Sequence, residues 1–172
     1  MITRRELALG AVAFTAIAAA GAGALRWRGR GAEAATEGHF EITRTPEEWR
    51  KLLTPEQYAV LRQEDTERPF TSPLNNEKRK GVFACAGCDL PLFASETKFD
   101  SGTGWPSFYA PIEGAVESGK DWSFGLLREE VHCRRCGGHL GHVFEDGPKP
   151  TGLRYCMNGL ALKFVAEGVG PA

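Results

Sequence analysis

The hydrophobic residues of this chain fall into short runs from about residue 69 onward, and this pattern is typical of β-strands. The runs alternate with polar residues and are bounded by Gly, Pro, Asn and Asp. Four of them predict strands, at 81–84, 122–127, 130–132 and 160–165. Before them, Thr45-Pro46 and Thr54-Pro55 each join an N-cap residue to a proline suited to the first helical position, which predicts two short helices within 45–64. The pattern therefore predicts an antiparallel β body with a little helix in front.

The first 35 residues follow a different pattern. Arg4-Arg5 precedes an uncharged run at 7–25 made mostly of alanine and glycine, and residues 32–34 (A-E-A) have the spacing that signal peptidase favours. This predicts a twin-arginine-like export signal and a periplasmic protein. A membrane anchor retained through residues 7–25, or an unstructured leader, is the alternative, because the run approaches the ~20 residues that span a bilayer. The three arginines within 26–30 also oppose easy translocation.

The length of 172 residues is that of one domain, and no second catalytic domain fits. We expect the export signal at 1–35, a linker at 36–44 and the folded domain at 45–168. Without residues 1–35, 16 Lys and Arg stand against 20 Asp and Glu, a formal charge of −4. This balance, with its scattered basic residues, predicts no nucleic-acid partner.

Five cysteines divide into two matched pairs and one single residue. The pairs, Cys85–Cys88 and Cys133–Cys136, are C-x-x-C knuckles, each of which places two sulfurs on one side of a metal ion. Two knuckles together predict one structural Zn²⁺ held by four thiolates. Two disulfides or a dithiol redox centre are the alternatives. A four-thiolate zinc has no open position for water, which excludes a zinc hydrolase.

Two further segments carry aromatic and histidine side chains. Trp105 lies between glycine and proline, where a tight turn can present its ring to a ligand, although burial in the core is the ordinary alternative. His139 and His142 lie three apart in a glycine-rich segment. They can ligate a metal, exchange protons or satisfy local hydrogen bonds, and ligation is the weakest of the three because four cysteines already complete a zinc shell.

Cys156 is the cysteine left over. In an extended strand, alternate positions place Arg154, Cys156 and Asn158 on one face. A guanidinium beside a thiol favours the thiolate, which is the nucleophile. The segment therefore predicts a reactive cysteine, with an inert buried cysteine as the alternative.

Taken together and in order, these motifs resemble those of the B-type methionine-R-sulfoxide reductases. The matching segments, all between Glu48 and Val165, are C-A-G-C, S-G-T-G-W-P-S-F, C-x-x-C-G-G-H-L-G-H-V-F, D-G-P and G-L-R-Y-C-x-N. The resemblance implies a mainly β fold of two antiparallel β-sheets with a structural zinc site made of four cysteines. It also implies an oxidoreductase of protein repair under oxidative stress, which returns methionine R-sulfoxide in proteins to methionine.

The resemblance implies roles for individual residues. Cys156 would be the nucleophile, and Trp105 would receive the sulfoxide methyl group. The residues that complete the site would be His139, His142, Arg154 and Asn158. The zinc ligands would be Cys85, Cys88, Cys133 and Cys136. The implied partners are oxidised proteins and a thioredoxin-like or other thiol reductant.

One position departs from the family pattern. Many members place a resolving cysteine where this chain has Thr103, and the chain has no sixth cysteine. We therefore expect a one-cysteine cycle, in which a sulfenic acid on Cys156 is reduced directly by an external thiol. A zinc-ribbon-like protein-binding module without catalysis is the alternative function. Such a module needs the cysteine pairs but not Trp105, His142 or Cys156, so these residues favour the enzyme.

Overall fold

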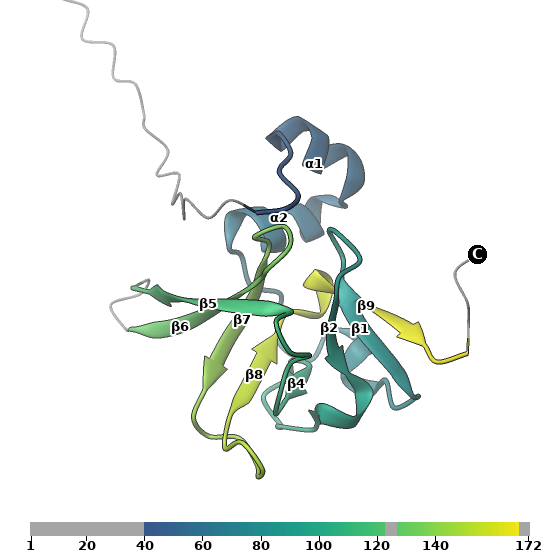
Figure 1. Cartoon of the computed structure of the whole chain (residues 1–172), viewed down its shortest axis with the longest axis vertical. Helices are drawn as coiled ribbons and strands as arrows, with labels where there is room; N and C mark the ends of the chain where they lie inside the picture. Colours follow the sequence, from purple (N-terminus) through teal and green to yellow (C-terminus); the bar gives the residue numbers. More distant parts are fainter. Residues whose placement is uncertain (1–39, 123–126, 169–172) are drawn as a thin grey trace, which may run out of the picture. The chain divides into compact units, whose positions relative to one another are not determined.

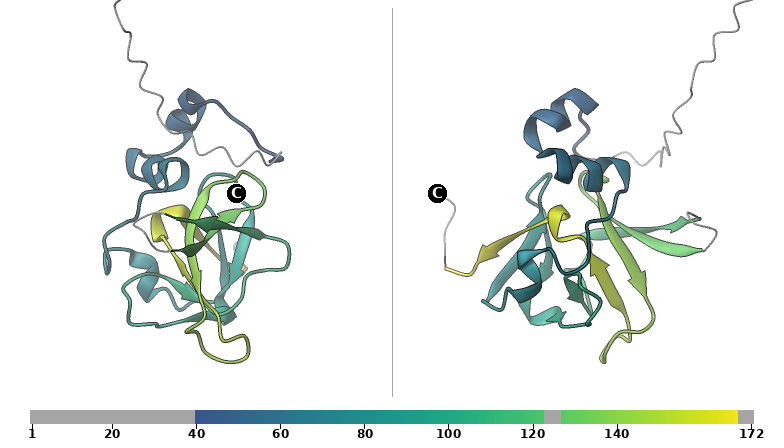
Figure 2. Two further views of the ribbon diagram at one scale, coloured as in Figure 1. Left: turned by 90° about the vertical axis from the view of Figure 1, so that its left-hand side faces the viewer. Right: turned by 180° about the vertical axis from the view of Figure 1, so that it is seen from behind.

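The computed structural model describes residues 40–122 and 127–168, and their body is built from two β-sheets with helices at one end (Figures 1 and 2). The expected mainly β fold with two antiparallel sheets is confirmed. The helical elements are α1 (Pro46–Leu52), α2 (Pro55–Gln63) and the 3₁₀ turns η1 (Pro73–Asn76), η2 (Ser95–Thr97) and η4 (Gly159–Ala161). The strands are β1 (Gly81–Cys85), β2 (Pro91–Ala94), β3 (Lys98–Phe99), β4 (Ser107–Phe108), β5 (Val116–Asp121), β6 (Arg128–Cys133), β7 (His139–Phe144), β8 (Arg154–Met157) and β9 (Leu162–Ala166).

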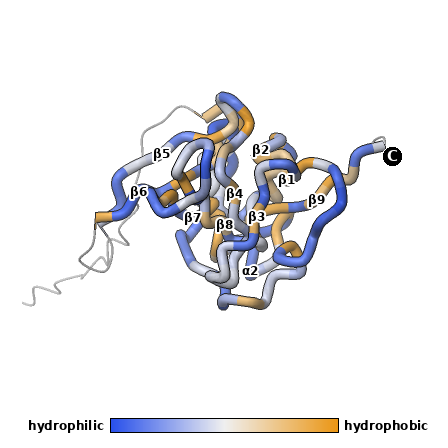
Figure 3. Tube along the Cα trace, turned by 90° about the horizontal axis from the view of Figure 1, so that it is seen from below, coloured by the Kyte–Doolittle hydropathy of each residue, from blue (hydrophilic) through white to orange (hydrophobic). Residues whose placement is uncertain are grey.

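The strand order places β8 in the interior of the larger sheet. That sheet runs β3-β4-β8-β7-β6-β5, and the smaller sheet runs β2-β1-β9. Because β8 lies between β4 and β7, Cys156 has Ser107 as its cross-strand neighbour on one side and His142 on the other. The β5–β6 hairpin projects away from the other strands (Figures 1 and 3).

The two expected helices are confirmed, and their caps explain where they begin. Thr45 accepts a hydrogen bond from the backbone N–H of Glu48, whose carboxylate accepts from the backbone N–H of Thr45. Thr54 and Gln57 make the same reciprocal pair at the start of α2. Each capping box satisfies two N–H groups that the helix itself leaves unpaired, which stabilises helices this short.

Aromatic side chains join the two sheets. Phe108 of β4 stacks on Phe93 of β2 at 4.4 Å between ring centroids and meets Phe83 of β1 edge-on at 5.0 Å. All three are fully buried. Burying each ring contributes roughly 2 kcal/mol or more, so this cluster fixes the smaller sheet against the strand next to Cys156.

The expected strands are confirmed in part. β1 and β6 cover the runs at 81–84 and 130–132, whereas the run at 160–165 starts with the turn η4 before β9 begins. Residues 123–126 of the run at 122–127 lie outside the described residues, as does the expected export signal at 1–35; Trp122 and Leu127 are not in strands. Among the described helices, none is long and apolar enough to cross a membrane.

Candidate active site and metal centre

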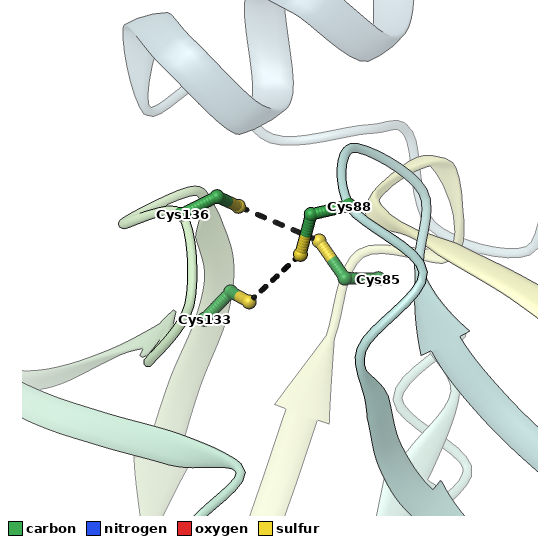
Figure 4. Close-up of side chains that lie close together, drawn as sticks. All are labelled: Cys85, Cys88, Cys133 and Cys136. Atoms are coloured by element: carbon green, nitrogen blue, oxygen red, sulfur yellow. Dashed lines mark hydrogen bonds between the residues drawn. The ribbon is translucent and has the colours of Figure 1, made fainter. Parts of the chain in front are cut away.

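The four paired cysteines converge at the junction of the two sheets (Figure 4). Their Sγ atoms all lie within 4.8 Å of one another, with 3.8 Å from Cys85 to Cys136 and 3.5 Å from Cys88 to Cys133. Four sulfurs at Zn–S distances of about 2.3 Å are about 3.8 Å apart in a tetrahedron. The four thiols are free, and both of these contacts join one knuckle to the other. The cluster can therefore hold one tetrahedral metal ion.

The two knuckles share one local geometry. In each, the backbone carbonyl of the first cysteine accepts the N–H of the residue four positions later, Asp89 at 3.0 Å and Gly137 at 2.8 Å. Both of these residues have positive φ, 63° at Asp89 and 64° at Gly137. This tight turn aims two sulfurs in the same direction. At Gly137 a side chain is also sterically excluded, because a Cβ atom would lie 2.3 Å from the ring of Phe40.

The N-terminal helices cover the cysteine cluster. Trp49 of α1 and Leu61 of α2 are buried in the same apolar core as Cys85 and Cys136. The guanidinium of Arg62 donates to the backbone carbonyl of Cys136 at 3.0 Å and stacks over the Trp49 ring. A metal ion here would therefore be shielded from solvent and would tie β1 to β6 and to the helices.

Cys156 lines a separate pocket of about 110 Å³ on the larger sheet. The residues around this pocket include Thr66, Trp105, His142, Phe144, Cys156 and Asn158. Trp105 is partly buried and lines the pocket, so it is not only a core residue. Cys156 is half-buried and lines the pocket, which is the placement of a reactive thiol rather than of an inert one.

Burial governs the protonation of Cys156. Burial raises the pKa of the Cys156 thiol above its ordinary value, while hydrogen bonding from Thr103 and the charge of Arg154 act in the opposite direction. The sequence-based expectation that Arg154 favours the thiolate has the right sign, but desolvation is the larger effect. With its pKa raised, Cys156 is a thiol rather than a thiolate near pH 7.

Arg154 has a partner that the sequence pattern did not reveal. Its guanidinium donates two hydrogen bonds to Asp146, from Nε to Oδ1 at 2.8 Å and from Nη2 to Oδ2 at 2.9 Å. It also stacks over the ring of Phe144 at 4.4 Å. The bidentate pair holds the pKa of Asp146 below its usual range and offsets part of the positive charge of Arg154 beside Cys156. The D-G-P motif that begins at Asp146 was the available signal.

His142 reaches the pocket from β7, directly opposite Cys156. Its Nε2 lies 2.9 Å from Oδ2 of Asp121, an oxygen that also accepts from Arg128 at 2.7 Å. Burial lowers the pKa of His142, and the hydrogen bond to Asp121 opposes this shift. His142 is therefore neutral near pH 7, with Nε2–H oriented towards the carboxylate.

An irregularity in β7 brings the two histidines together. In a regular strand, residues three apart point to opposite faces. Here Val131 pairs with Gly141 but His132 pairs with His139, so Leu140 is an extra residue in β7. The rings of His139 and His142 consequently meet edge-on at 5.4 Å. His139 is almost fully buried beside the pocket and bonds through Nδ1 to Glu130 at 2.7 Å, so its main observed contact is with Glu130.

Glu67 connects three parts of the site and was missed by sequence reasoning. Its backbone N–H donates to Oδ1 of Asn158 at 3.0 Å, and its backbone carbonyl accepts from Nε1 of Trp105 at 3.0 Å. Its buried carboxylate accepts the backbone N–H groups of Gly159 and Leu160. Asn158 also donates to the backbone carbonyl of Leu140 at 3.2 Å, so it holds strands together as well as lining the pocket.

Hydroxyl groups lie beside Cys156, and one of them belongs to Thr103, the position at which many family members have a resolving cysteine. The Thr103 hydroxyl lies 3.9 Å from Sγ of Cys156 and 2.8 Å from the Ser101 hydroxyl. Ser101 is in turn 2.7 Å from the hydroxyl of Ser107, the β4 neighbour of Cys156. These groups can accept or donate hydrogen bonds as the sulfur changes its protonation or oxidation state.

A family model and several relatives that match this chain agree with one another. Residues 53–166 match the family model described as the SelR domain. The chain is 54% identical over 130 residues to the peptide methionine sulfoxide reductase MsrB of Leptospira interrogans, an alignment that covers 75% of this chain and 99% of that protein. It is 61% identical over 125 residues to MsrB of Pseudomonas putida strain W619, covering 72% and 94%. It is 57% identical over 130 residues to MsrB of Methanosarcina barkeri, covering 75% and 92%.

Proposed function

The chain belongs to the SelR-domain family of peptide methionine sulfoxide reductases, and we propose on this premise that Cys156 performs the reduction by attacking the sulfoxide of an oxidised protein. The family makes the chain an oxidoreductase that acts on methionine R-sulfoxide. One observation carries the assignment of the nucleophile: Cys156 lines a pocket, while the other four cysteines face one another in a cluster. A non-catalytic zinc module offers no reason for that pocket.

The first step transfers one oxygen atom from the sulfoxide sulfur of the substrate to the sulfur of Cys156. The Cys156 sulfur attacks the sulfoxide sulfur, the sulfur–oxygen bond of the substrate breaks, and the oxygen ends on Cys156 as a sulfenic acid. The substrate sulfur gains two electrons and leaves as the thioether of methionine, while the Cys156 sulfur loses two. The thiol proton of Cys156 is carried to the sulfoxide oxygen, so the step needs no other proton.

His142 is suited to move that proton. It is neutral near pH 7, lies opposite Cys156 and lines the same pocket. With Nε2 bound to Asp121, Nδ1 is the nitrogen that takes the proton from the thiol and returns it to the sulfoxide oxygen, directly or through water. Asp121 stabilises the imidazolium that forms briefly.

Trp105 orients the substrate. Its indole N–H donates to the backbone carbonyl of Glu67, which holds the ring in one position beside the pocket. An apolar face next to Cys156 accepts the methyl group of the sulfoxide and directs the oxygen away from it. Placement of the methyl group selects one epimer at sulfur, consistent with one enzyme for each epimer.

The second step requires an external reductant. Two thiols, or one dithiol such as a thioredoxin-like protein, reduce the Cys156 sulfenic acid to the thiol and release water and a disulfide. Thr103 offers a hydroxyl where a resolving thiol would stand, which supports a one-cysteine cycle. Cys85, Cys88, Cys133 and Cys136 would hold a structural Zn²⁺, and as its ligands their sulfurs would stay outside this cycle.

The decisive experiment separates the epimers. The full chain and its Cys156→Ser variant are given dabsylated methionine R-sulfoxide and S-sulfoxide with excess dithiothreitol, and the methionine formed is quantified. The proposal predicts turnover of the R epimer alone and its loss in the variant. Absence of turnover of both epimers by folded protein overturns the proposal, and retained turnover in Cys156→Ser overturns the nucleophile.

We also propose that the protein is exported, on the support of the twin-arginine-like pattern at 1–35. Mass determination of the mature protein distinguishes a cleaved signal from a retained anchor. Replacing Arg4 and Arg5 with lysine should leave the protein in the cytoplasm, because the paired arginines define the signal. Unchanged periplasmic recovery of that variant would contradict the proposed route.

A further inference from the structure

Three hydroxyl groups connect Cys156 to the backbone of Trp105. The Thr103 hydroxyl lies 3.9 Å from Sγ of Cys156 and 2.8 Å from the Ser101 hydroxyl. The Ser101 hydroxyl is in turn 2.7 Å from that of Ser107, which is fully buried and donates to the backbone carbonyl of Trp105 at 3.1 Å. We call Ser101, Thr103 and Ser107 the hydroxyl chain.

The turn before β4 holds Thr103 beside the reactive sulfur. Gly102 and Gly104, on either side of Thr103, have φ of 71° and 94°, which glycine adopts without the strain that other residues incur. The carbonyl of Gly104 accepts two hydrogen bonds, from the backbone N–H of Phe70 at 2.7 Å and from Nδ2 of Asn75 at 2.9 Å. The turn is therefore anchored by the rest of the fold, which keeps the Thr103 hydroxyl in place.

The direction of the hydrogen bonds in the chain follows from its protons. A hydroxyl has one proton to donate and two lone pairs that accept. Ser107 donates its proton to the Trp105 carbonyl, so it accepts from Ser101. Ser101 has then used its own proton, so it accepts from Thr103. The Thr103 oxygen therefore faces Cys156 as an acceptor, which suits a neutral thiol that donates its S–H.

The same chain can run in the opposite direction when the sulfur becomes negative. Each hydroxyl rotates about its C–O bond, so that Thr103 donates to the sulfur, Ser101 to Thr103, and Ser107 to Ser101. The bond given up is the one from Ser107 to the backbone carbonyl. A neutral hydrogen bond is thus exchanged for one to an ionised sulfur, and bonds to ionised groups are about twice as strong. Reversal of the chain therefore stabilises the ionised form of Cys156.

We propose that Thr103 is a catalytic residue, which accepts a hydrogen bond from the Cys156 thiol at rest and donates one to the sulfur as the thiol proton leaves. Ser101 acts through Thr103 as a positioning residue, and Ser107 fixes the far end of the chain. This inference rests on the function proposed above and adds a group to its first step. The thiol proton itself passes to His142, while the Thr103 proton stays on its oxygen. Hydrogen bonding from Thr103 and Ser107 lowers the pKa of Cys156, against the larger effect of burial.

Ionisable groups also lie near Cys156, and they have other tasks. Arg154, on the same strand, is held in its bidentate pair with Asp146. His142 approaches from β7 and takes the thiol proton, whereas β4 places Ser107 opposite Cys156. Variants of the hydroxyl chain leave Arg154 and His142 in the protein. A change in the ionisation of Cys156 in such variants therefore reports on the hydroxyl groups.

The test measures how readily Cys156 ionises, from its rate of alkylation by iodoacetamide near pH 7 in the full chain. The thiolate displaces iodide, so the rate follows the ionised fraction, and mass spectrometry of the Cys156 peptide separates it from the other cysteines. Thr103→Val should slow alkylation about fivefold, the factor for a hydrogen bond worth about 1 kcal/mol, whereas Thr103→Ser keeps the hydroxyl and should stay within about twofold. The matched control Thr43→Val removes an exposed hydroxyl elsewhere and should leave the rate unchanged.

A double-mutant cycle tests whether the hydroxyls act as a chain. Ser101→Ala should slow alkylation about threefold by itself and add nothing to Thr103→Val, because Ser101 acts through Thr103. A slowing of about fifteenfold in the double variant, the product of two independent effects, overturns the chain. Equal slowing in Thr103→Ser and Thr103→Val, or an unchanged rate in Thr103→Val, overturns the role of the Thr103 hydroxyl.

The outcomes also separate this inference from the proposed function. In a single turnover of dabsylated methionine R-sulfoxide, Thr103→Val should be slowed by a factor similar to that for alkylation, because both reactions need the ionised sulfur. Alkylation needs no sulfoxide, so its rates decide the role of Thr103 by themselves. If the unaltered protein reduces no sulfoxide while Thr103→Val still slows alkylation, the proposed function fails and the hydrogen bond to Cys156 stands.

Discussion

The hydroxyl oxygen of Thr103 lies 3.9 Å from Sγ of Cys156, which is close to the position that a resolving sulfur needs. A disulfide requires about 2.05 Å between sulfurs, so a thiol at position 103 would have to move closer to Cys156 by rotation of the side chains. The chain therefore has the geometry of an intramolecular exchange but not the second thiol for it.

Thr103→Cys should convert the one-cysteine cycle into a two-cysteine cycle. After a single turnover without reductant, the unaltered protein should carry a Cys156 sulfenic acid that dimedone traps. The variant should instead carry a disulfide, because its new thiol condenses with the sulfenic acid and releases water. Mass spectrometry distinguishes a dimedone adduct from a disulfide, and Thr103→Ser is the control that keeps the hydroxyl. A dimedone adduct at full yield in Thr103→Cys would contradict the geometry.

The pH dependence of the first step follows from two shifted pKa values. Burial lowers the pKa of His142, and His142 must be neutral to accept the thiol proton, so the acid limb of the single-turnover rate should lie below pH 6.5. Burial raises the pKa of Cys156, and its proton is needed on the sulfoxide oxygen, so the alkaline limb should lie above the ordinary pKa of a thiol. Quenched-flow measurement between pH 5 and about 10.5 tests both limbs. His142→Asn should abolish the acid limb; its persistence assigns that limb to another group.

Sequence patterns that extend over only a few residues predicted the helix starts and the C-x-x-C turns of this fold. The helices begin where Thr45 and Thr54 cap them, and the knuckles form because each is a short turn with both sulfurs in the same segment. The proximity of the two knuckles followed from chemistry, since one ion needs four ligands.

The missed features depend on residues that lie far apart in the chain or on irregular geometry. Glu67 is 91 residues from Asn158, and no periodic pattern connects them. The extra residue in β7 reverses the face expected for His139 relative to His142, and alternation cannot predict it. The pKa of Cys156 depends mainly on burial, which the sequence does not give. Arg154 alone therefore indicated only the direction of one contribution to that pKa.

Loss of one cluster cysteine should unfold the protein rather than slow it. Cys88→Ser removes one of four sulfurs that join the two sheets. A structural zinc site can contribute about 10 kcal/mol, comparable with the whole free energy of unfolding of a domain, about 5–15 kcal/mol. Elemental analysis should show zinc lost, and circular dichroism should show no cooperative transition, whereas Cys156→Ser should keep both. A stable Cys88→Ser variant that lacks only turnover would indicate a redox role for the cluster.

Gly141 permits the close approach of β7 to β8. A Cβ atom there would lie 2.1 Å from the backbone oxygen of Cys156. Gly141→Ala should therefore force the strands apart, lower the free energy of unfolding by about 1–3 kcal/mol, and slow single turnover by up to about 100-fold as His142 moves from Cys156. Gly119→Ala on β5 is the control, because a Cβ atom there meets open space. Chemical denaturation and single-turnover rates together test it, and unchanged values in both would show that the strands can adjust.

Glu67 should act as a positioning residue through its carboxylate. That group accepts the N–H groups of Gly159 and Leu160, immediately after Asn158, and it is the backbone of Glu67 that holds Trp105. Glu67→Ala leaves two N–H groups without their acceptor, which should lower the free energy of unfolding by about 2–4 kcal/mol.

The same variant should raise KM for dabsylated methionine R-sulfoxide more than it lowers kcat, since the Trp105 ring loses its fixed position while Cys156 and His142 keep theirs. Glu67→Gln keeps one acceptor oxygen, so its KM should lie between those of the unaltered chain and Glu67→Ala. The control Glu56→Ala changes an exposed residue of α2 and should have the KM of the unaltered chain. Steady-state kinetics at a temperature where all four proteins are folded separates the two constants. A fall in kcat alone, with KM unchanged, would place the effect of Glu67 on the chemical step and not on the Trp105 wall.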